Sequence, residues 1–223
     1  MSLYGQLLLA SIAGPLFLSF DKKVAYFKNW KHLFPAILFS AVIFIVKDIL
    51  FAQNNVWSFN PIYTGTLYWY GLPLEEWLFF IVIPYCCIFI YEVLNAYFPT
   101  NWLISTAPLL ADGLGLLLVF SGIFFLPKWY TGGYFIFTGL SLLVINRWKK
   151  PGFMANFLRA YAVALIPFLI VNGVLTAMPV VEYNSNHILN LRIYTIPVED
   201  TVYCLSMLLI PSAIFEYLKS RSA

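Results

Sequence analysis

Seven long runs of apolar residues constrain the fold of this chain more than any other feature. A helix that crosses a lipid bilayer needs about 20 mostly apolar residues. Runs of roughly that length cover residues 3–20, 33–52, 74–97, 103–126, 130–146, 155–178 and 198–218. Because a backbone in hydrocarbon must satisfy its own hydrogen bonds, the pattern predicts an all-α membrane protein with seven transmembrane helices.

The composition supports this class and argues against several kinds of site. Only 10% of the residues are charged, against about 25% in an average soluble domain. The three cysteines lie inside apolar runs and are too few for a disulfide scaffold or a zinc site. The sequence shows no metal-ligand spacing, no dinucleotide-binding glycine motif and no basic cluster typical of nucleic-acid binding. It therefore predicts neither a metal nor another cofactor, and no nucleic-acid partner.

The basic residues predict an orientation. Ten of the thirteen lie beyond the first run, around the link between the fifth and sixth runs, or beyond the seventh run. These ten are Lys22, Lys23, Lys28, Lys31, Arg147, Lys149, Lys150, Arg159, Lys219 and Arg221. Because basic loops stay on the cytoplasmic side, we expect the N-terminus outside and the C-terminus in the cytoplasm.

An internal repeat relates the two halves of the chain. A shift of 124 residues superposes the acidic pair Glu75 and Glu76 on Glu199 and Asp200 without a gap. The same shift matches Pro73 with Pro197, Asp48 with Asn172, Asn60 with Asn184, Tyr70 with Tyr194 and Glu92 with Glu216. Chance similarity between apolar segments would match leucine with leucine, so these polar matches indicate a repeat, which sets the architecture.

The repeat predicts how the helices are organised. We expect a first three-helix repeat in residues 1–98, a linking transmembrane helix in 99–127 and a second three-helix repeat in 128–223. Because one helix links them, both repeats run in the same direction through the membrane. A pseudo-twofold axis along the membrane normal then relates them, with any site near their interface.

Several polar groups are expected to converge at one depth, near the outer ends of the helices. They are Glu75, Glu76, Glu199, Asp200, Asp48 and Asn172. One interpretation is helix capping, since acids are favoured in a first helical turn. The alternative is acid/base chemistry: adjacent carboxyl groups in a poorly solvated pocket do not both ionise cheaply, so one acid keeps its proton beside an ionised partner. The doubling of the acids favours chemistry, because one acid would suffice for a cap.

Aromatic residues accompany these acids. Phe79 and Phe80 lie one helical turn after Glu75 and Glu76, and Tyr203 lies one turn after Glu199. Aromatic faces stabilise cations, including carbocations, without acting as nucleophiles. Further rings crowd the same end, namely Trp57, Tyr68, Trp69, Tyr70 and Trp77. An interfacial aromatic belt is the alternative explanation for this second group.

The motifs PLEEWLFF, FLIVNGVLT, PVVEYN and LRIYTIPVEDTVY resemble those of the integral-membrane lycopene cyclase domain family. The resemblance covers nearly the whole chain and both repeats, as in the fused tandem form of the family. It implies an isomerase, or intramolecular lyase, of carotenoid biosynthesis in a bacterial or archaeal cytoplasmic membrane. The implied reaction is a non-redox cyclisation of the ψ-ends of lycopene to β-ionone rings, giving γ-carotene and then β-carotene. The implied partners are lycopene, or another long carotenoid, and membrane lipid.

The resemblance also assigns roles to residues. The family motif makes Glu75, Glu76, Glu199 and Asp200 catalytic, with Glu75 and Glu199 expected as the principal acids and the other two as base or charge partner. The residues expected to bind the substrate or orient the acids are Phe79, Phe80, Tyr203, Trp77, Asp48, Asn60, Asn172 and Asn184. Whether both acidic motifs catalyse is left open, because the two half-sites differ.

Two other functions share some of these features. A proton-coupled transporter of a small substrate also has intramembrane carboxylates and repeats, but it predicts a water-filled path with few aromatic residues. A retinal-type receptor needs a lysine in the middle of its last helix, and residues 198–218 contain none. The sequence leaves open the ring type, whether one or both ends are cyclised, a flavin or lipid requirement, the oligomeric state and association with other carotenoid-pathway enzymes.

Overall fold

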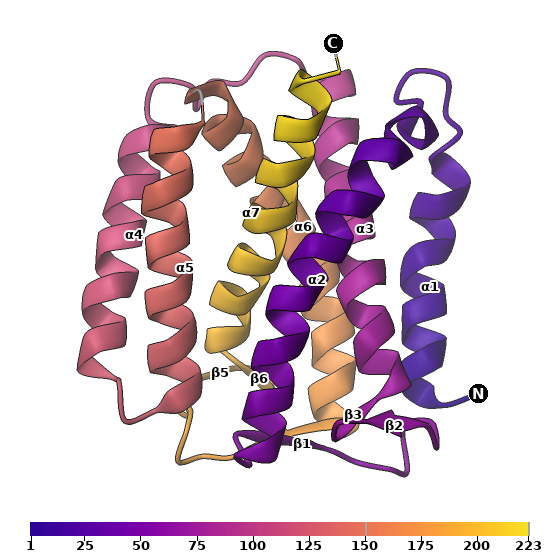
Figure 1. Ribbon diagram of the computed structural model, residues 1–223, viewed down its shortest axis with the longest axis vertical. Coiled ribbons are helices and arrows are strands. Elements are labelled where there is room, and N and C mark those ends of the chain that lie inside the picture. The colour runs from indigo at the N-terminus through magenta and orange to yellow at the C-terminus, as the bar shows by residue number, and fades with distance from the viewer. Residues whose placement is uncertain (150, 223) are drawn as a thin grey trace.

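Seven α-helices stand side by side in one bundle (Figure 1) in the part of the chain that the computed structural model describes, residues 1–149 and 151–222. They are α1 (Leu3–Leu18), α2 (Trp30–Gln53), α3 (Leu74–Tyr97), α4 (Ala107–Phe124), α5 (Trp129–Trp148), α6 (Pro151–Ala177) and α7 (Glu199–Ser220). A 3₁₀-helix, Tyr26–Asn29, leads into α2. The helices follow the seven apolar runs, and α3 begins and ends at the predicted residues.

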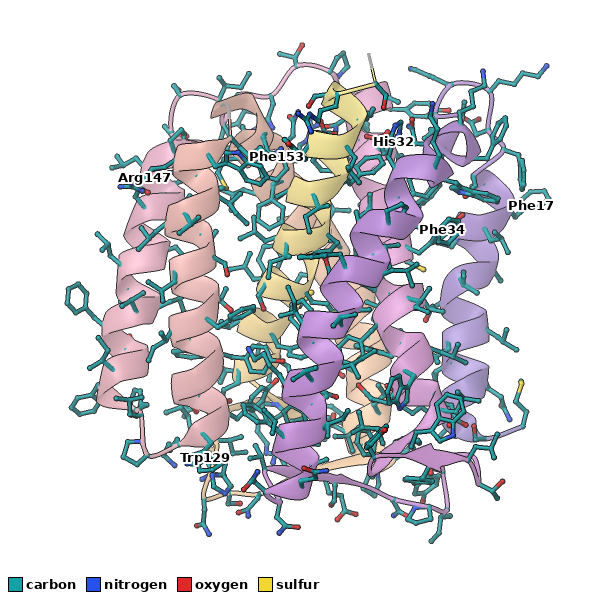
Figure 2. The ribbon with its side chains drawn as sticks, viewed as in Figure 1. Phe17, His32, Phe34, Trp129, Arg147 and Phe153 are labelled. Carbon is teal, nitrogen blue, oxygen red and sulfur yellow. The ribbon has the colours of Figure 1, made fainter. Side chains whose placement is uncertain are left out.

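The helices have the length and surface of membrane spans. Five of those described, α2, α3, α4, α6 and α7, are long and apolar enough to cross a bilayer. Helix α1 is shorter, at 16 residues, and α5 turns polar side chains such as Thr131 and Thr138 into the bundle. Large apolar side chains point outward, as Phe17 does in Figure 2 with 80% of its surface exposed. The chain is an all-α membrane protein.

The two ends of the bundle differ in character. The short strands and the N-terminus lie at one end, and the C-terminus lies at the other (Figure 1). Figure 2 shows Trp129 at the strand end and Arg147 at the opposite end. The strand end is thus the one that the basic residues predict to face outward, although Lys150 lies outside the described residues.

The strands repeat with the same spacing as the acidic motifs. They are β1 (Trp57–Phe59), β2 (Tyr68–Trp69), β3 (Leu72–Pro73), β4 (Val181–Tyr183), β5 (Arg192–Ile193) and β6 (Ile196–Pro197). Each strand of the second set begins 124 residues after its counterpart. The chain is thus a tandem of two three-helix repeats, while the repeat boundaries at 98 and 128 stay predictions.

Strands β1 and β4 pair across the interface of the two repeats. They are antiparallel, with Ser58 opposite Glu182 at the centre of the register. These two residues are themselves equivalent in the repeat, so the pairing is self-complementary, as a twofold contact requires. The pseudo-twofold axis therefore passes through this strand pair.

A tight hairpin precedes each acidic helix. Strands β2 and β3 pair through the two-residue turn Tyr70–Gly71, whose φ angles are 52° and 87°. Two consecutive positive φ angles define the hairpin turn that suits strand twist, and glycine adopts them without steric cost. Tyr194, the equivalent of Tyr70, also has a positive φ of 59°. Because β3 and β6 run directly into α3 and α7, these hairpins set where the acids lie.

Helix α4 packs closely along α5. A Cβ atom added to Gly139 of α5 would lie 2.6 Å from the carbonyl oxygen of Gly115 in α4. Such contact between backbones is typical of membrane helices with small residues at their interface. Helix α4 thus lies beside the second repeat at the edge of the bundle (Figure 1).

Candidate active site

The two acids of each pair point in different directions. Consecutive residues of an α-helix are about 100° apart around its axis, so adjacent acids in a first turn face different neighbours. Glu76 and Asp200 point to the interface of the repeats, whereas Glu75 and Glu199 point to the outer loops. All four are buried.

Glu75 and Glu199 each anchor an outer loop. The backbone N–H of Gly65 donates to Glu75 Oε1 at 2.8 Å, and the Ser2 hydroxyl also donates to that oxygen. Glu199 Oε1 accepts from the N–H of Leu189 and the hydroxyl of Thr131, both at 2.6 Å. Gly65 and Leu189 are 124 residues apart, so the two anchors are equivalent.

A pair of carboxyl groups forms the first half of the central cluster. Asp48 of α2 and Glu76 of α3 line the same side of the central cavity, close enough to influence each other's charge. The Tyr4 hydroxyl donates to Glu76 Oε2 at 2.6 Å. Two carboxyl groups buried beside each other do not both ionise cheaply. Burial therefore favours one protonated and one ionised group in this half.

A carboxyl group that accepts three hydrogen bonds forms the second half. Asp200 Oδ1 accepts from the Tyr130 hydroxyl at 2.6 Å. Its Oδ2 accepts from the Asn172 amide at 2.7 Å and the Tyr183 hydroxyl at 2.9 Å. Burial raises the pKa of Tyr183 well above its usual value, so this phenol stays a donor at neutral pH. Three donors stabilise a charged carboxylate without a nearby cation.

One small cavity of about 40 Å³ joins the two halves. Asp48, Glu76 and Asp200 line it together with Asn172. Its aromatic and apolar walls are Tyr4, Trp57, Phe59, Phe79, Tyr130, Leu175, Val181, Tyr183 and Tyr203. Paired acids, a third carboxyl group with three donors and aromatic faces around one small cavity suit a reaction through a carbocation.

A family comparison agrees with this site. The model of the lycopene cyclase family matches residues 2–94 and 127–218, which together make up most of the chain. The chain belongs to the lycopene cyclase family. Searches of curated proteins and of solved structures gave no match. Membership in the lycopene cyclase family implies an enzyme that cyclises carotenoids.

The two matched segments of this lycopene cyclase family member correspond to the two repeats. The interval between them contains the end of α3 and all of α4. Every residue of the central cavity falls inside the matched segments. The linking helix α4, which packs on α5, contributes no lining residue to that cavity.

The predicted substrate residues divide into two groups in this cyclase-family chain. Asp48, Asn172, Phe79 and Tyr203 line the cavity. The others lie elsewhere. The ring of Phe80 stacks on Phe44 at 6.1 Å between centroids, and that of Trp77 lies 5.8 Å from Trp69 in the outer hairpin.

Asn60 and Asn184 hold outer turns. The side-chain oxygen of each accepts the backbone N–H two residues later, from Ile62 and Asn186, at 3.0 Å. This local bond is typical of asparagine in turns. These two residues therefore shape the loops around β1 and β4, and within the described part of the chain neither forms a hydrogen bond with the acids or lines the cavity.

Sequence reasoning missed the tyrosines that bind the acids. Tyr4 and Tyr130 are equivalent in space, but they are 126 residues apart, so the shift of 124 does not align them. A signal was present, because each is a polar aromatic residue near the outer end of the first helix of its repeat. Tyr183 has no counterpart, since Phe59 occupies the equivalent position.

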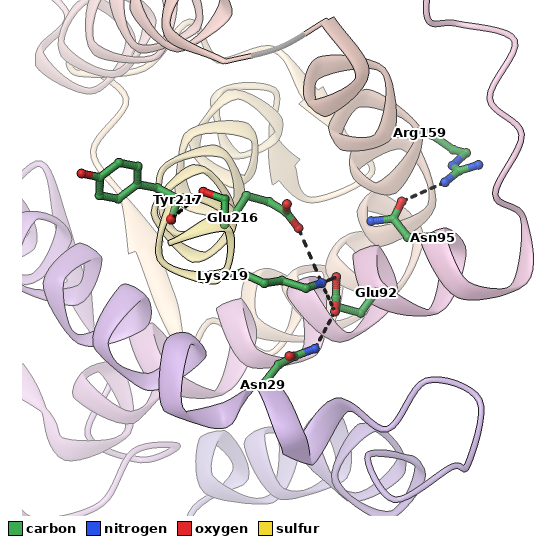
Figure 3. Close-up of polar contacts among 8 residues, drawn as sticks. Asn29, Glu92, Asn95, Arg159, Glu216, Tyr217 and Lys219 are labelled. Carbon is green, nitrogen blue, oxygen red and sulfur yellow. Dashed lines mark hydrogen bonds and ion pairs between the residues drawn. The ribbon is translucent and has the colours of Figure 1, made fainter. Parts of the chain in front are cut away.

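A separate polar network lies at the other end of the bundle (Figure 3). Glu92 accepts from the Lys219 ammonium at 2.8 and 2.9 Å and from the Asn29 amide at 2.9 Å. Glu216, its equivalent, lies 3.9 Å from the same ammonium. These contacts join α3, α7 and the start of α2, which indicates a structural role. Among the described residues no group of His, Cys, Asp and Glu is arranged to hold a metal ion.

Proposed function

We propose that the chain is a lycopene β-cyclase, an isomerase that closes the ψ-ends of lycopene into β-ionone rings by acid/base catalysis. One observation carries the proposal: Asp48, Glu76 and Asp200 share one cavity with aromatic walls. Family membership supports a carotenoid cyclase in general, and the geometry favours this particular reaction.

The reaction needs one proton to enter and one to leave. The acid protonates C2 of the terminal alkene and creates a tertiary cation at C1. The C5=C6 double bond attacks C1, which closes the ring and moves the positive charge to C5. Loss of the proton from C6 then gives the β-ring. The carbon skeleton gains and loses one proton, so the product is an isomer of the substrate.

We assign Glu76, paired with Asp48, as the proton donor and Asp200 as the carboxylate that stabilises the cation and accepts the C6 proton. This division differs from the expectation that Glu75 and Glu199 are the principal acids. It is favoured because Glu76 and Asp200 line the cavity. Glu75 and Glu199 are then positioning residues, which hold the loops through Gly65 and Leu189.

A separate apolar groove of about 440 Å³ lies between α1, α3 and α6. Ile83 of the groove lies one turn after Phe79 of the cavity, and Val171 lies one turn before Leu175. A long hydrocarbon is the substrate that such a groove suits. We therefore propose that the polyene of lycopene lies in the groove while one ψ-end reaches the acids.

The proton-coupled transporter is the weaker alternative. It predicts a hydrated path with few aromatic side chains near the acids. Aromatic rings instead make up much of the cavity wall, among them Trp57, Phe79 and Tyr203.

Expression in bacteria that accumulate lycopene tests the proposal. The parent chain should convert red lycopene into γ-carotene and β-carotene, separated by chromatography. Glu76→Gln and Asp200→Asn should each abolish conversion, because a general acid or base contributes about 10²–10⁴-fold in rate. The control variant Glu216→Gln removes an acid at the opposite end of the bundle and should stay active. Unchanged lycopene with the parent chain, or full conversion by both active-site variants, would refute the assignment.

We also propose that the chain lies in a bacterial or archaeal cytoplasmic membrane with the N-terminus outside. The concentration of Lys and Arg at the end that bears the C-terminus supports this orientation. A green fluorescent protein fused to the C-terminus should then fluoresce, and alkaline phosphatase at the same position should stay inactive. A dark fluorescent fusion and an active phosphatase fusion would instead show that the C-terminus lies outside.

A further inference from the structure

The two repeats present unequal sides to the membrane. We infer that the lycopene chain lies only in the groove between α1, α3 and α6, and that Lys47 and Phe137 exclude it from the symmetry-related side between α5, α7 and α2. The inference rests on the proposed function and deepens it. It identifies a pair of equivalent positions, Val171 and Lys47, that decides which side of the bundle accepts the substrate.

The open side carries small or apolar side chains. Val171 of α6 and Ser11 of α1 both line the groove. The Ser11 hydroxyl donates to the Leu7 carbonyl of its own helix at 2.8 Å. Its hydrogen therefore needs no partner in the groove. Cys86 likewise directs its thiol to the Ser11 carbonyl at 3.4 Å. The groove therefore offers a hydrocarbon chain an almost wholly apolar wall.

The related side carries larger side chains at the equivalent positions. The shift of 124 that relates the acidic motifs takes Val171 to Lys47. The shift of 126 that relates Tyr4 to Tyr130 takes Ser11 to Phe137. The Lys47 Nζ lies 3.6 Å from the ring centroids of both Phe137 and Tyr134.

These side chains fill the space between α2 and α5. Phe137 of α5 also packs edge-on against Phe44 of α2, at 6.0 Å between centroids. The Lys47 Nζ is buried and has no hydrogen-bond partner among the described residues, so its contacts are with aromatic faces. A desolvated ammonium gains most from such faces.

A polyene entering this side would have to separate Lys47 from the two rings. The ammonium would then lie against hydrocarbon, where a charge is costly. The groove at α1, α3 and α6 imposes no such cost, because Val171 is uncharged. The same argument predicts that a lysine at position 171 closes the open groove.

The decisive variant is Val171→Lys. We expect lycopene conversion to fall about a hundredfold, since a charge facing hydrocarbon is strongly unfavourable. Ile166→Lys is the matched control, because it puts the same charge on the same helix at a position that faces lipid and is 61% exposed. It should insert as well as Val171→Lys and should retain conversion. Conversion by Val171→Lys at the level of this control would overturn the inference.

Lycopene retention separates this inference from the proposed function. In the Glu76→Gln background, which should bind lycopene without converting it, purified protein should carry lycopene, measured by its visible absorption. Adding Val171→Lys should remove that pigment, and adding Ile166→Lys should not. If the parent chain does not convert lycopene and the Glu76→Gln variant does not retain it, the proposed function fails and the inference fails with it. If the parent converts lycopene and Val171→Lys still retains it, only the inference fails.

The converse variant opens the closed side. Lys47→Val combined with Phe137→Ser reproduces the residues of the open groove. In the Glu76→Gln background this double variant should bind a second lycopene molecule per chain. Unchanged stoichiometry in a folded double variant would show that Lys47 and Phe137 are not the barrier, and would overturn their assignment.

Discussion

Two single-residue differences make the two half-sites chemically unlike. Asp48 of the first repeat stands where the second repeat has Asn172, and Phe59 stands where it has Tyr183. The first difference supplies a carboxyl group that can share a proton with Glu76. The second supplies a phenol that donates to Asp200. One repeat thus favours a protonated acid and the other a carboxylate.

Asp48→Asn should test the proton-sharing pair. Asparagine keeps the size of the side chain but cannot release a proton, so we expect cyclisation to fall by about 10²-fold or more. The rate of β-carotene formation in membranes measures this effect, and the melting temperature of the solubilised protein checks the fold. A stable variant with the parent rate would rule out a role for Asp48 in the donor pair.

Tyr183→Phe should test the carboxylate half. It removes one of three donors to Asp200, and a hydrogen bond to a charged group is worth about 1.5–3 kcal/mol. We therefore expect a rate at least about tenfold lower. Tyr68→Phe is the matched control, because its hydroxyl bonds Thr64 in the outer loop and no acid. Equal effects of the two variants would contradict a specific role for Tyr183.

At the scale of elements, the sequence predicted the helices well and the short strands not at all. Helix α3 runs from Leu74 to Tyr97 as predicted, because apolar length is a direct consequence of bilayer thickness. Strands of two or three residues are too short to show a period of two. The positive φ of Tyr70 likewise depends on the hairpin that it closes.

The site was predictable in its acids but not in their directions. The repeat identified Glu76 and Asp200 together with Asp48 and Asn172, which meet in the cavity. Which acid of each adjacent pair faces the cavity depends on how α3 and α7 are rotated. Tertiary packing sets that rotation, so the sequence alone did not assign it.

The contact between α4 and α5 makes a prediction about stability. Gly139→Leu should drive a side chain into the backbone of α4, and overpacking costs about 1–3 kcal/mol. We expect a lower melting temperature in detergent and lower expression. Gly113→Leu is the matched control, since a Cβ at Gly113 of α4 meets no atom within 4 Å. A Gly139→Leu variant as stable as this control would show that the close approach is unimportant.

At the scale of the whole molecule, neither repeat contains a complete site. The cavity takes residues from both repeats, and β1 of one pairs with β4 of the other. Two chains produced by a break in the connection between α3 and α4 should therefore be inactive singly. They should regain lycopene conversion when expressed together, as measured by carotenoid chromatography. Conversion by either fragment alone would contradict a shared site.

The cavity between the repeats has a consequence for the product mixture. Lycopene has two identical termini, and the cavity between the repeats holds one set of acids, so we expect it to take one terminus at a time. After one end is cyclised, γ-carotene has to leave the cavity and turn round before its second end can enter. Otherwise it diffuses away through the bilayer. The ratio of monocyclic to bicyclic pigment should then depend on how often a released molecule meets an enzyme, so that sparse enzyme in a lycopene-rich membrane leaves γ-carotene behind.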